Sequence, residues 1–225
     1  MKTPFPRRKF LKSTLTTGAL ASGVLLSSWC ARVMAAISDP VRSQIFSHGV
    51  ASGDPTQKSV VLWSRITASG RVNVVWQLAS ESSFINILQQ GESVTDAETD
   101  HTLKIEVKNL DAGKVYYYRF IVDGITSEPG RTRTLPDGPI QKLGIAVASC
   151  SNYPFGYFNA YEEIARDEDI DFVVHLGDYI YEYGADGWGA VQGDRLGRIH
   201  SPSHEIVSLS DYRERHAQYL SLIHI

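Results

Sequence analysis

Hydrophobic and polar residues alternate with a period of two through much of the first half of the chain. Residues 72–79 and 103–108 each place an apolar side chain at every second position. This alternation is typical of β-strands that bury one face. Further strands are predicted at residues 59–66 and 115–122, with Gly, Asp and Pro clusters marking the turns. Short strands at this spacing predict a β-sandwich over residues 42–136.

The pattern changes after a junction rich in proline and glycine at residues 129–139. A short apolar strand is predicted at residues 142–149, a helix at about residues 157–166, and a second apolar strand from residue 171. These lengths predict a right-handed βαβ unit whose two strands are parallel and adjacent. The second strand is one continuous apolar run, which predicts that it is fully buried.

Both strands of this unit are followed by residues that can bind a metal. Cys150 follows the first strand, and Asp178 follows the second, three residues before Tyr181. The carboxyl ends of parallel strands meet at one edge of a sheet, where open α/β proteins bind their ligands. We therefore expect Cys150 and Asp178 to face a common site. His175 lies within the second strand and is predicted to be a core residue rather than a ligand.

Charge is distributed unevenly along the chain. The first 36 residues hold six of the 22 basic residues and no acidic residue, which leaves 16 basic against 25 acidic residues, a net charge of −9, in the remainder. An acidic body argues against a nucleic-acid-binding surface and suits a protein that holds cations.

The basic N-terminus, residues 1–36, is predicted to be a targeting segment. Arg7 and Arg8 precede a weakly apolar stretch at residues 13–28, as in twin-arginine export signals. That stretch is too short and polar to span a membrane, so no membrane span is expected in the mature chain. The predicted partner is the twin-arginine export machinery, and the predicted location is the periplasm or the exterior. Cys30 is removed with the signal, so Cys150 has no disulfide partner within the chain and is expected to be buried or ligated.

Several runs of residues carry a resemblance to one family. They are residues 50–55, 59–65, 115–120, 148–150, 175–184 and 211–219. They resemble the PhoD-type alkaline phosphatases of the metallophosphoesterase superfamily, and the last two runs are the most specific. Binuclear members of that superfamily usually end the first strand in Asp-x-His and the second in Gly-Asp-x-x-Asp. Here Cys150 stands in place of the first aspartate and Tyr181 in place of the last, while Asp178 is kept.

The resemblance implies an exported phosphatase that acts on phosphomonoesters and phosphodiesters through a centre of Fe(III) and calcium. It implies that Cys150 and Tyr181 bind iron as thiolate and phenolate, and that Asp178 bridges iron to calcium. The nucleophile would be an oxygen activated by the metals, so no catalytic side chain is assigned. The implied fold is a fibronectin type III-like or Ig-like β-sandwich followed by the first part of an α/β metallophosphoesterase domain, in a monomer. Tyr116 is expected to tie its strand to the preceding loop through its hydroxyl group.

The remaining predictions concern the C-terminal quarter. Residues 184–206 are predicted to form an irregular loop over the substrate, with His200 and His204 at its surface. Ser210 is predicted to cap the following helix. Residues 140–219 are interpreted as the N-terminal part of the metallophosphoesterase domain. Residues 220–225 resemble a translated sequencing adaptor, so we expect an incomplete core and site and an inactive fragment.

Two other functions stay open from the sequence. The chain could be a cell-surface binding module built on the fibronectin-like domain, with no catalysis. It could also belong to a conventional binuclear phosphodiesterase that uses other metals. Iron with calcium in the full-length protein would favour the iron- and calcium-dependent phosphatase over the binding module. Loss of the site on replacing both Cys150 and Tyr181 would exclude a conventional binuclear site.

Overall fold

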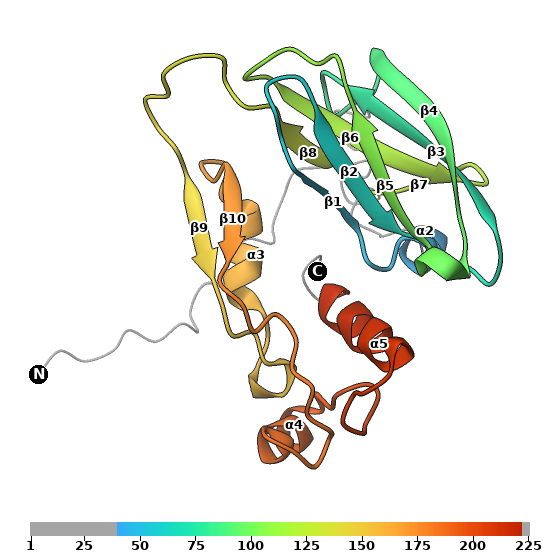
Figure 1. The fold of residues 1–225 in the computed structure, drawn as a ribbon, viewed down its shortest axis with the longest axis vertical. Coiled ribbons are helices and arrows are strands. Elements are labelled where there is room, and N and C mark those ends of the chain that lie inside the picture. Colours follow the sequence, from blue (N-terminus) through green and yellow to red (C-terminus); the bar gives the residue numbers. More distant parts are fainter. Residues whose placement is uncertain (1–39, 222–225) are drawn as a thin grey trace, which may run out of the picture. The chain divides into compact units, whose positions relative to one another are not determined.

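The computed structural model describes residues 40–221 of the chain. The predicted export signal at residues 1–36, with Cys30, lies outside the described residues, as do residues 222–225 of the predicted adaptor segment. From residue 50 to residue 133 the chain forms antiparallel strands, and from residue 145 it forms a parallel pair of strands and helices (Figure 1). None of the helices within residues 40–221 has the length and apolar character needed to cross a membrane.

Two antiparallel sheets make up the first region. The first sheet has the order β1-β2-β5, and the second has the order β4-β3-β6-β7 with β8 also paired to β6. Its elements are α2 (Pro40–Ile45), β1 (Val50–Gly53), β2 (Val60–Arg65), β3 (Val72–Ala79), β4 (Ile87–Thr95), the 3₁₀ helix η1 (Ala97–Thr99), β5 (Thr102–Val107), β6 (Val115–Val122), β7 (Ile125–Thr126) and β8 (Gly130–Arg133). The predicted strands at residues 72–79 and 115–122 are confirmed with the same bounds.

Both sheets contribute side chains to one core. Leu62 of β2, Leu78 of β3 and Phe120 of β6 are each fully buried and belong to the same apolar cluster. Along β6, buried and partly buried residues alternate, so one face of the strand packs inward. The apolar pattern in the sequence therefore predicts the buried faces of this region correctly.

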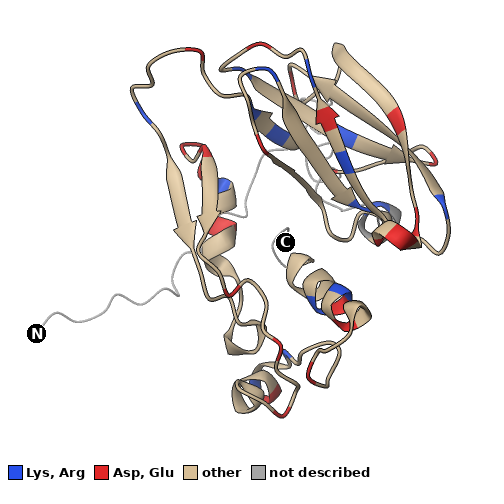
Figure 2. Ribbon diagram, viewed as in Figure 1, with Lys and Arg blue, Asp and Glu red and all other residues tan. Residues whose placement is uncertain are grey.

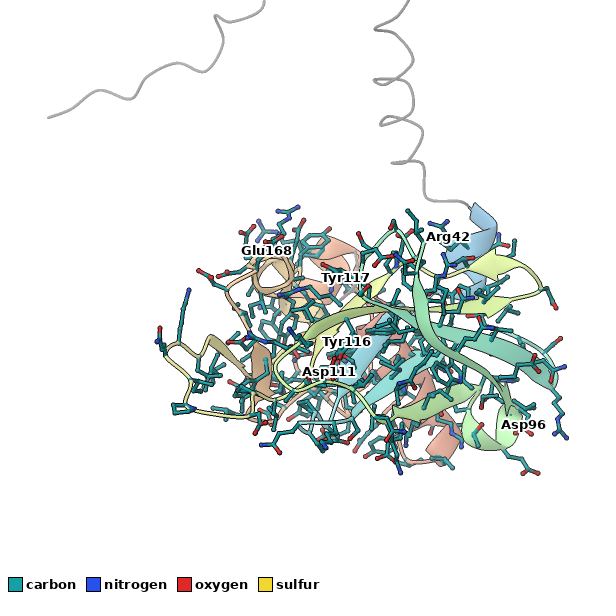
Figure 3. The ribbon with its side chains drawn as sticks, turned by 90° about the horizontal axis from the view of Figure 1, so that it is seen from above. Arg42, Asp96, Asp111, Tyr116, Tyr117 and Glu168 are labelled. Carbon is teal, nitrogen blue, oxygen red and sulfur yellow. The ribbon has the colours of Figure 1, made fainter. Side chains whose placement is uncertain are left out.

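Tyr116 anchors the loop that precedes β6. Its hydroxyl oxygen accepts a hydrogen bond from the backbone N–H of Asp111 at 2.9 Å, and it lies 3.4 Å from the carbonyl oxygen of the same residue (Figure 3). The Tyr116 side chain is buried. The structure thus confirms that a tyrosine hydroxyl ties this strand to its loop.

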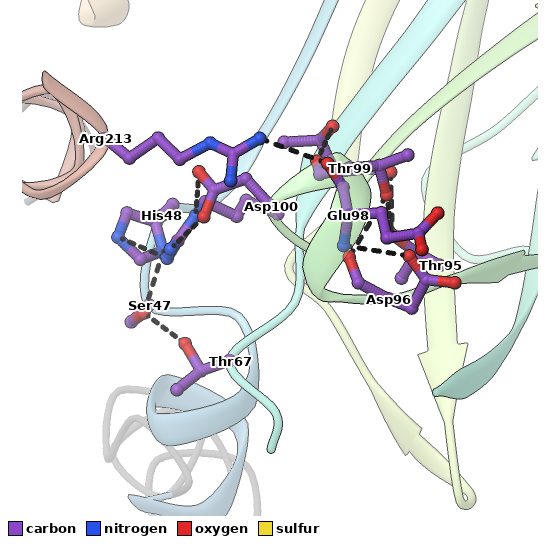
Figure 4. Close-up of polar contacts among 11 residues, drawn as sticks. Ser47, His48, Thr67, Thr95, Asp96, Glu98, Thr99, Asp100 and Arg213 are labelled. Carbon is purple, nitrogen blue, oxygen red and sulfur yellow. Dashed lines mark hydrogen bonds and ion pairs between the residues drawn. The ribbon is translucent and has the colours of Figure 1, made fainter. Parts of the chain in front are cut away.

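A network of polar side chains connects β2 of the first sheet to the residue that follows η1 and to residues 47 and 48 (Figure 4). Arg65 of β2 contacts both carboxylate oxygens of Asp100, at 3.0 and 2.9 Å. Burial raises the pKa of Asp100, but the hydrogen bonds and charge of Arg65 outweigh burial and lower it. His48 is also buried here, 3.0 Å from the Ser47 hydroxyl, as expected for a hydrogen-bonded histidine. Arg213 donates to the carbonyl oxygen of Glu98 at 3.1 Å.

The second region contains the predicted βαβ unit. Its elements are β9 (Ile145–Ala148), the 3₁₀ helix η2 (Tyr153–Phe155), α3 (Asn159–Arg166), β10 (Phe172–His175), α4 (Ala190–Leu196) and α5 (Leu209–Leu220). Strands β9 and β10 pair in parallel, with Phe172 opposite Ile145 and His175 opposite Ala148. The predicted parallel and adjacent arrangement of the two strands is confirmed.

The prediction that β10 is fully buried is wrong. Phe172, Val173 and Val174 are 44%, 49% and 36% exposed. Within residues 40–221 this sheet has only two strands, and α3 has no fully buried side chain. A two-stranded sheet next to one such helix leaves much of its apolar surface in contact with water.

Two predictions for the C-terminal quarter also need correction. The segment 184–206 is not wholly irregular, because α4 lies within it. Ser210 does not cap α5: the N-cap is Ser208, whose hydroxyl accepts from the N–H of Asp211 while the Asp211 carboxylate accepts from the N–H of Ser208. This reciprocal capping box places the start of the helix two residues earlier than predicted. Basic and acidic residues both occur along α5 (Figure 2).

His200 is the clearest departure from expectation. It was predicted at the surface but is only 3% exposed, whereas His204 is exposed as predicted. The His200 ring lies between polar partners, with Nδ1 at 2.9 Å from the carbonyl oxygen of Tyr183 and Nε2 at 3.1 Å from the hydroxyl of Tyr219. Burial lowers its pKa to about 4, so the ring is neutral at physiological pH.

Candidate metal centre

Three side chains meet at the carboxyl ends of β9 and β10. The Cys150 Sγ atom lies 3.4 Å from Oδ2 of Asp178, and the Tyr181 hydroxyl lies 3.2 Å from the same oxygen. The structure therefore brings together all three residues that the sequence predicts at this site. They come from two segments that are 28 residues apart in the chain.

Backbone hydrogen bonds hold the two segments side by side beyond the strands. The N–H of Leu176 donates to the carbonyl of Ala148, and the N–H of Cys150 donates to the carbonyl of Gly177 at 3.1 Å. The N–H of Ser151 then donates to the carbonyl of Asp178, also at 3.1 Å. This ladder continues the parallel pairing into the loops and holds Cys150 beside Gly177, next to Asp178.

Unusual backbone conformations occur at the same two residues. Cys150 has φ = 60° and Asp178 has φ = 52°, both in the left-handed region. Gly177, just before Asp178, has φ = 117°, a value that residues with a Cβ atom rarely adopt. Left-handed residues other than glycine are uncommon and are enriched at functional sites, where surrounding contacts hold them in place. Here both belong to the group of side chains that converge.

The electrostatics of the group suit a cation. Burial, followed by the hydrogen bond and charge of Asp178, raises the pKa of the Tyr181 phenol. Without a cation, this phenol keeps its proton and directs it at Asp178. Thiolate, carboxylate and phenolate are all anionic donors, and a highly charged ion can take the place of the protons between them. The donor set therefore fits a highly charged cation.

Tyrosine is essential to this donor set. Within residues 40–221, no group of three or more His, Cys, Asp or Glu side chains is arranged to hold a metal ion. Three possible metal-binding side chains meet at this site only when the Tyr181 phenol is counted with Cys150 and Asp178. Cys150 is exposed and has no disulfide partner among residues 40–221, so its thiol is open to a ligand rather than buried.

His175 has a different role from that of a ligand. Its Nδ1 accepts from the N–H of Gly177 at 3.3 Å, and its Nε2 lies 2.9 Å from the Tyr161 hydroxyl of α3. It is half-buried rather than in the core, and its contacts hold the turn before Asp178 against the helix. Both ring nitrogens thus have hydrogen-bond partners, and the absence of His175 from the ligands stays a prediction.

An aromatic group that the sequence analysis did not single out surrounds Tyr181. The ring centroids of Tyr183 and Trp188 lie 6.1 and 5.7 Å from that of Tyr181, and Phe155 lies 4.8 Å from Trp188. Trp188 is 56% exposed. The contact between Trp188 and Phe155 joins the loop after β10 to η2. In the sequence, the only sign of this aromatic group is the presence of Tyr181 and Tyr183 at alternate positions.

Comparison with known proteins decides the family. Residues 31–136 match the N-terminal domain of PhoD-like phosphatases, and residues 145–223 match the PhoD-like phosphatase domain itself. The chain belongs to the PhoD-like phosphatase family. Membership of this family confirms the resemblance seen in the sequence.

Individual members of the PhoD-like phosphatase family agree with this assignment. Alkaline phosphatase D of Bacillus subtilis (strain 168) is 37% identical over 228 residues, which cover 96% of this chain and 38% of that protein. The solved structure of PhoD matches with a TM-score of 0.70 and 39% identity, over 80% of this chain and 36% of the other. The chain thus spans little more than a third of the length of either relative.

Proposed function

We propose that this chain is part of an exported alkaline phosphatase that hydrolyses phosphomonoesters and phosphodiesters at a centre of Fe(III) and calcium. Cys150 and Tyr181 are proposed as iron ligands, and Asp178 as the bridge between iron and calcium. One observation carries the proposal: the Cys150 thiol and the Tyr181 phenol both reach the same carboxylate oxygen of Asp178, at 3.4 and 3.2 Å.

The residues of the chain itself hold and orient the site. Asp178 offers a second carboxylate oxygen beyond the one shared with Cys150 and Tyr181, which suits a bridging ligand. When bound, the metals would polarise the phosphoryl group and supply an activated oxygen nucleophile. Trp188 lies beside Tyr181, with 5.7 Å between the ring centroids.

The domain assignments belong to the same proposal. Residues 42–136 are assigned to a fibronectin type III-like domain, with the Tyr116–Asp111 contact in support. Residues 140–219 are assigned to the first part of the metallophosphoesterase domain. Residues 1–36 are assigned to a twin-arginine signal, which would deliver the protein to the periplasm or the exterior.

We further propose that the 225-residue polypeptide does not hydrolyse phosphate esters by itself. Calcium in proteins takes about six to eight oxygen ligands, and the described site offers a single carboxylate among its three donors. The relatives are also much longer, since the chain covers only 38% of alkaline phosphatase D. Hydrolysis of p-nitrophenyl phosphate by the purified 225-residue chain would refute this part of the proposal.

Iron binding tests the ligand assignment without relying on activity. Fe(III) is titrated into the purified chain and into the variants Cys150→Ser and Tyr181→Phe, with visible absorption to detect thiolate or phenolate ligation. Each variant is expected to lose about tenfold or more in iron affinity, and Tyr181→Phe should lose the phenolate band.

Tyr183→Phe is the matched control, because its ring stacks on Tyr181 but is not assigned as a ligand. This control should bind iron like the unmodified chain. Equal binding by all four proteins would overturn the ligand assignment, and a site that binds other divalent metals without Cys150 and Tyr181 would indicate a conventional binuclear centre.

A further inference from the structure

Helix α5 presents two buried polar side chains to the loops that carry the metal-site residues. Arg215 has no exposed surface and Tyr219 is 1% exposed. The two residues are four positions apart, so they lie on the same face of the helix, one turn from each other. Both lie in the run of residues 211–219 that resembles the PhoD-type phosphatases.

Arg215 donates all of its hydrogen bonds to backbone carbonyl groups. Its Nη1 contacts the carbonyl oxygens of Tyr181 and Tyr183, the latter at 3.0 Å. Its Nε and Nη2 contact the carbonyls of Ser201 and Pro202 at 3.0 and 2.8 Å. Within residues 40–221 it forms no ion pair. The rigid guanidinium therefore joins the segment containing Tyr181 to residues 201–202.

Tyr219 reaches the other segment of the site. Its hydroxyl oxygen accepts from the N–H of Tyr153 at 2.9 Å, three residues after Cys150. It also lies 3.1 Å from Nε2 of His200, whose Nδ1 is 2.9 Å from the carbonyl oxygen of Tyr183. Because a carbonyl only accepts, Nδ1 carries the His200 proton, so Nε2 accepts the proton of the Tyr219 hydroxyl.

These contacts form one continuous unit that reaches both sides of the site. Arg215 holds the backbone of Tyr181 directly, Tyr219 holds the loop after Cys150, and His200 connects the two through Tyr183. The convergence of Cys150 and Tyr181 on one oxygen of Asp178 depends on the relative position of these two segments. A displacement of about 1 Å in either segment would separate the donors, since ligand geometry must be held to within about 0.5 Å.

We propose that Arg215 and Tyr219 are positioning residues that set the relative placement of Cys150 and Tyr181. Neither side chain contacts the Cys150 thiol, the Asp178 carboxylate or the Tyr181 phenol. They act through the backbone of the two donor-bearing segments. The consequence for iron binding rests on the proposed function, whereas the consequence for backbone order does not.

Hydrogen exchange measured by NMR on the metal-free 225-residue chain tests the backbone consequence. The informative amides are Ala185, which donates to Ser203, and Ile206, which donates to Glu182. Arg215→Met should raise the exchange rates of both amides about tenfold or more. The variant removes the guanidinium that joins the backbone carbonyls of residues 181 and 183 to those of residues 201 and 202. Tyr219→Phe should raise the exchange rate of the Tyr153 amide by a similar factor. The amide of Phe120 in β6 should be unchanged in both variants.

Arg213→Met is the matched control, since Arg213 lies on the same helix and donates to Glu98 instead. It should leave the exchange of Ala185, Ile206 and Tyr153 unchanged. If Arg215→Met unfolds the second region, Tyr219→Phe decides, because it removes one hydroxyl group and preserves the ring. Equal exchange rates in Tyr219→Phe and the unmodified chain would then overturn the proposal.

Iron titration separates positioning from a purely structural role. Arg215→Lys keeps the charge but not the fork of donors, so it should lower iron affinity about tenfold and broaden the phenolate band, whereas Arg213→Met should not. Unchanged affinity and an unchanged band in Arg215→Lys and Tyr219→Phe, despite faster exchange, would overturn the proposal. If the unmodified chain binds no iron, the proposed function fails, and the exchange rates alone decide whether these residues order the two segments.

Discussion

Different interactions stabilise the two regions of this molecule, the antiparallel sheets and the region that begins at residue 145. In the antiparallel sheets, the largest fully buried side chains include Phe120, Leu62 and Leu78, which pack against one another in one core. Between residues 145 and 221, the fully buried large side chains are Arg215 and Tyr219, and the strand residues Val147 and Val173 are exposed. The first region therefore depends on apolar packing, and the second depends on side chains that bind backbone groups.

This difference has consequences for how each region responds to change. Apolar burial is non-directional, so a core tolerates small shifts of its elements but loses stability when volume is removed. Hydrogen bonds from a buried guanidinium depend on direction, and their loss leaves buried carbonyls without partners. A metal site benefits from the second kind of support, because its geometry is set by fixed directions.

The largest expected effect is the loss of stability when an apolar side chain is shortened in the core of the antiparallel sheets, compared with the same kind of change in β10. Phe120→Ala should lower the free energy of unfolding of the sheet region by about 3–5 kcal/mol, because it removes a fully buried ring and leaves a cavity. Val173→Ala in β10 should cost less than about 1 kcal/mol, because Val173 is 49% exposed. Urea denaturation of the 225-residue chain, followed by far-ultraviolet circular dichroism, measures both. A cost for Val173→Ala close to that for Phe120→Ala would show that the contrast between the regions is wrong.

An intermediate effect is expected from the pH dependence of the second region. The pKa of His200 is lowered from its ordinary value of 6.5 to about 4, mainly by burial, with the charge of Arg215 adding to the effect. The unfolded chain therefore binds more protons than the folded chain between these two values. Stability is fully present above about pH 6.5 and falls as the pH decreases toward 4, by at most about 3 kcal/mol.

Substitution of His200 tests this prediction. Denaturation at pH 7.5 and pH 5 should give a smaller difference for His200→Gln than for the unmodified chain. Identical pH profiles for His200→Gln and the unmodified chain would show that the buried ring does not carry the dependence.

The smallest expected effect concerns the start of α5. Ser208→Ala removes the hydroxyl that accepts from the Asp211 N–H and should destabilise the second region by about 1 kcal/mol. Hydrogen bonds from the backbone of Ser208 and Val207 lower the pKa of Asp211 to about 2, so the cap contributes above about pH 4 and is lost as the pH falls toward 2. Ser210→Ala, the control two residues after the cap, should cost less. The reverse order of the two costs in thermal denaturation would show that Ser210 is the cap.

The sequence alone predicted features that depend on local pattern. Strands β3 and β6 follow the alternation of apolar residues, with the predicted bounds. The meeting of Cys150 and Asp178 followed from parallel pairing, since a strand, a helix and a strand place both carboxyl ends at one edge. The family resemblance added Tyr181 to the pair, and the structure places its hydroxyl at the same carboxylate.

Only the tertiary structure decided which polar residues became buried supports. Nothing in the local pattern distinguishes Arg215 from Arg213 or His200 from His204, because each pair occurs in a similar polar stretch. Their roles depend on partners such as Tyr181 and Tyr183, which are distant in the sequence. The exposure of β10 was likewise decided by how many strands lie beside it rather than by its composition. Local periodicity determines which face of an element is apolar, whereas the burial of an individual polar side chain depends on long-range contacts that satisfy its hydrogen bonds.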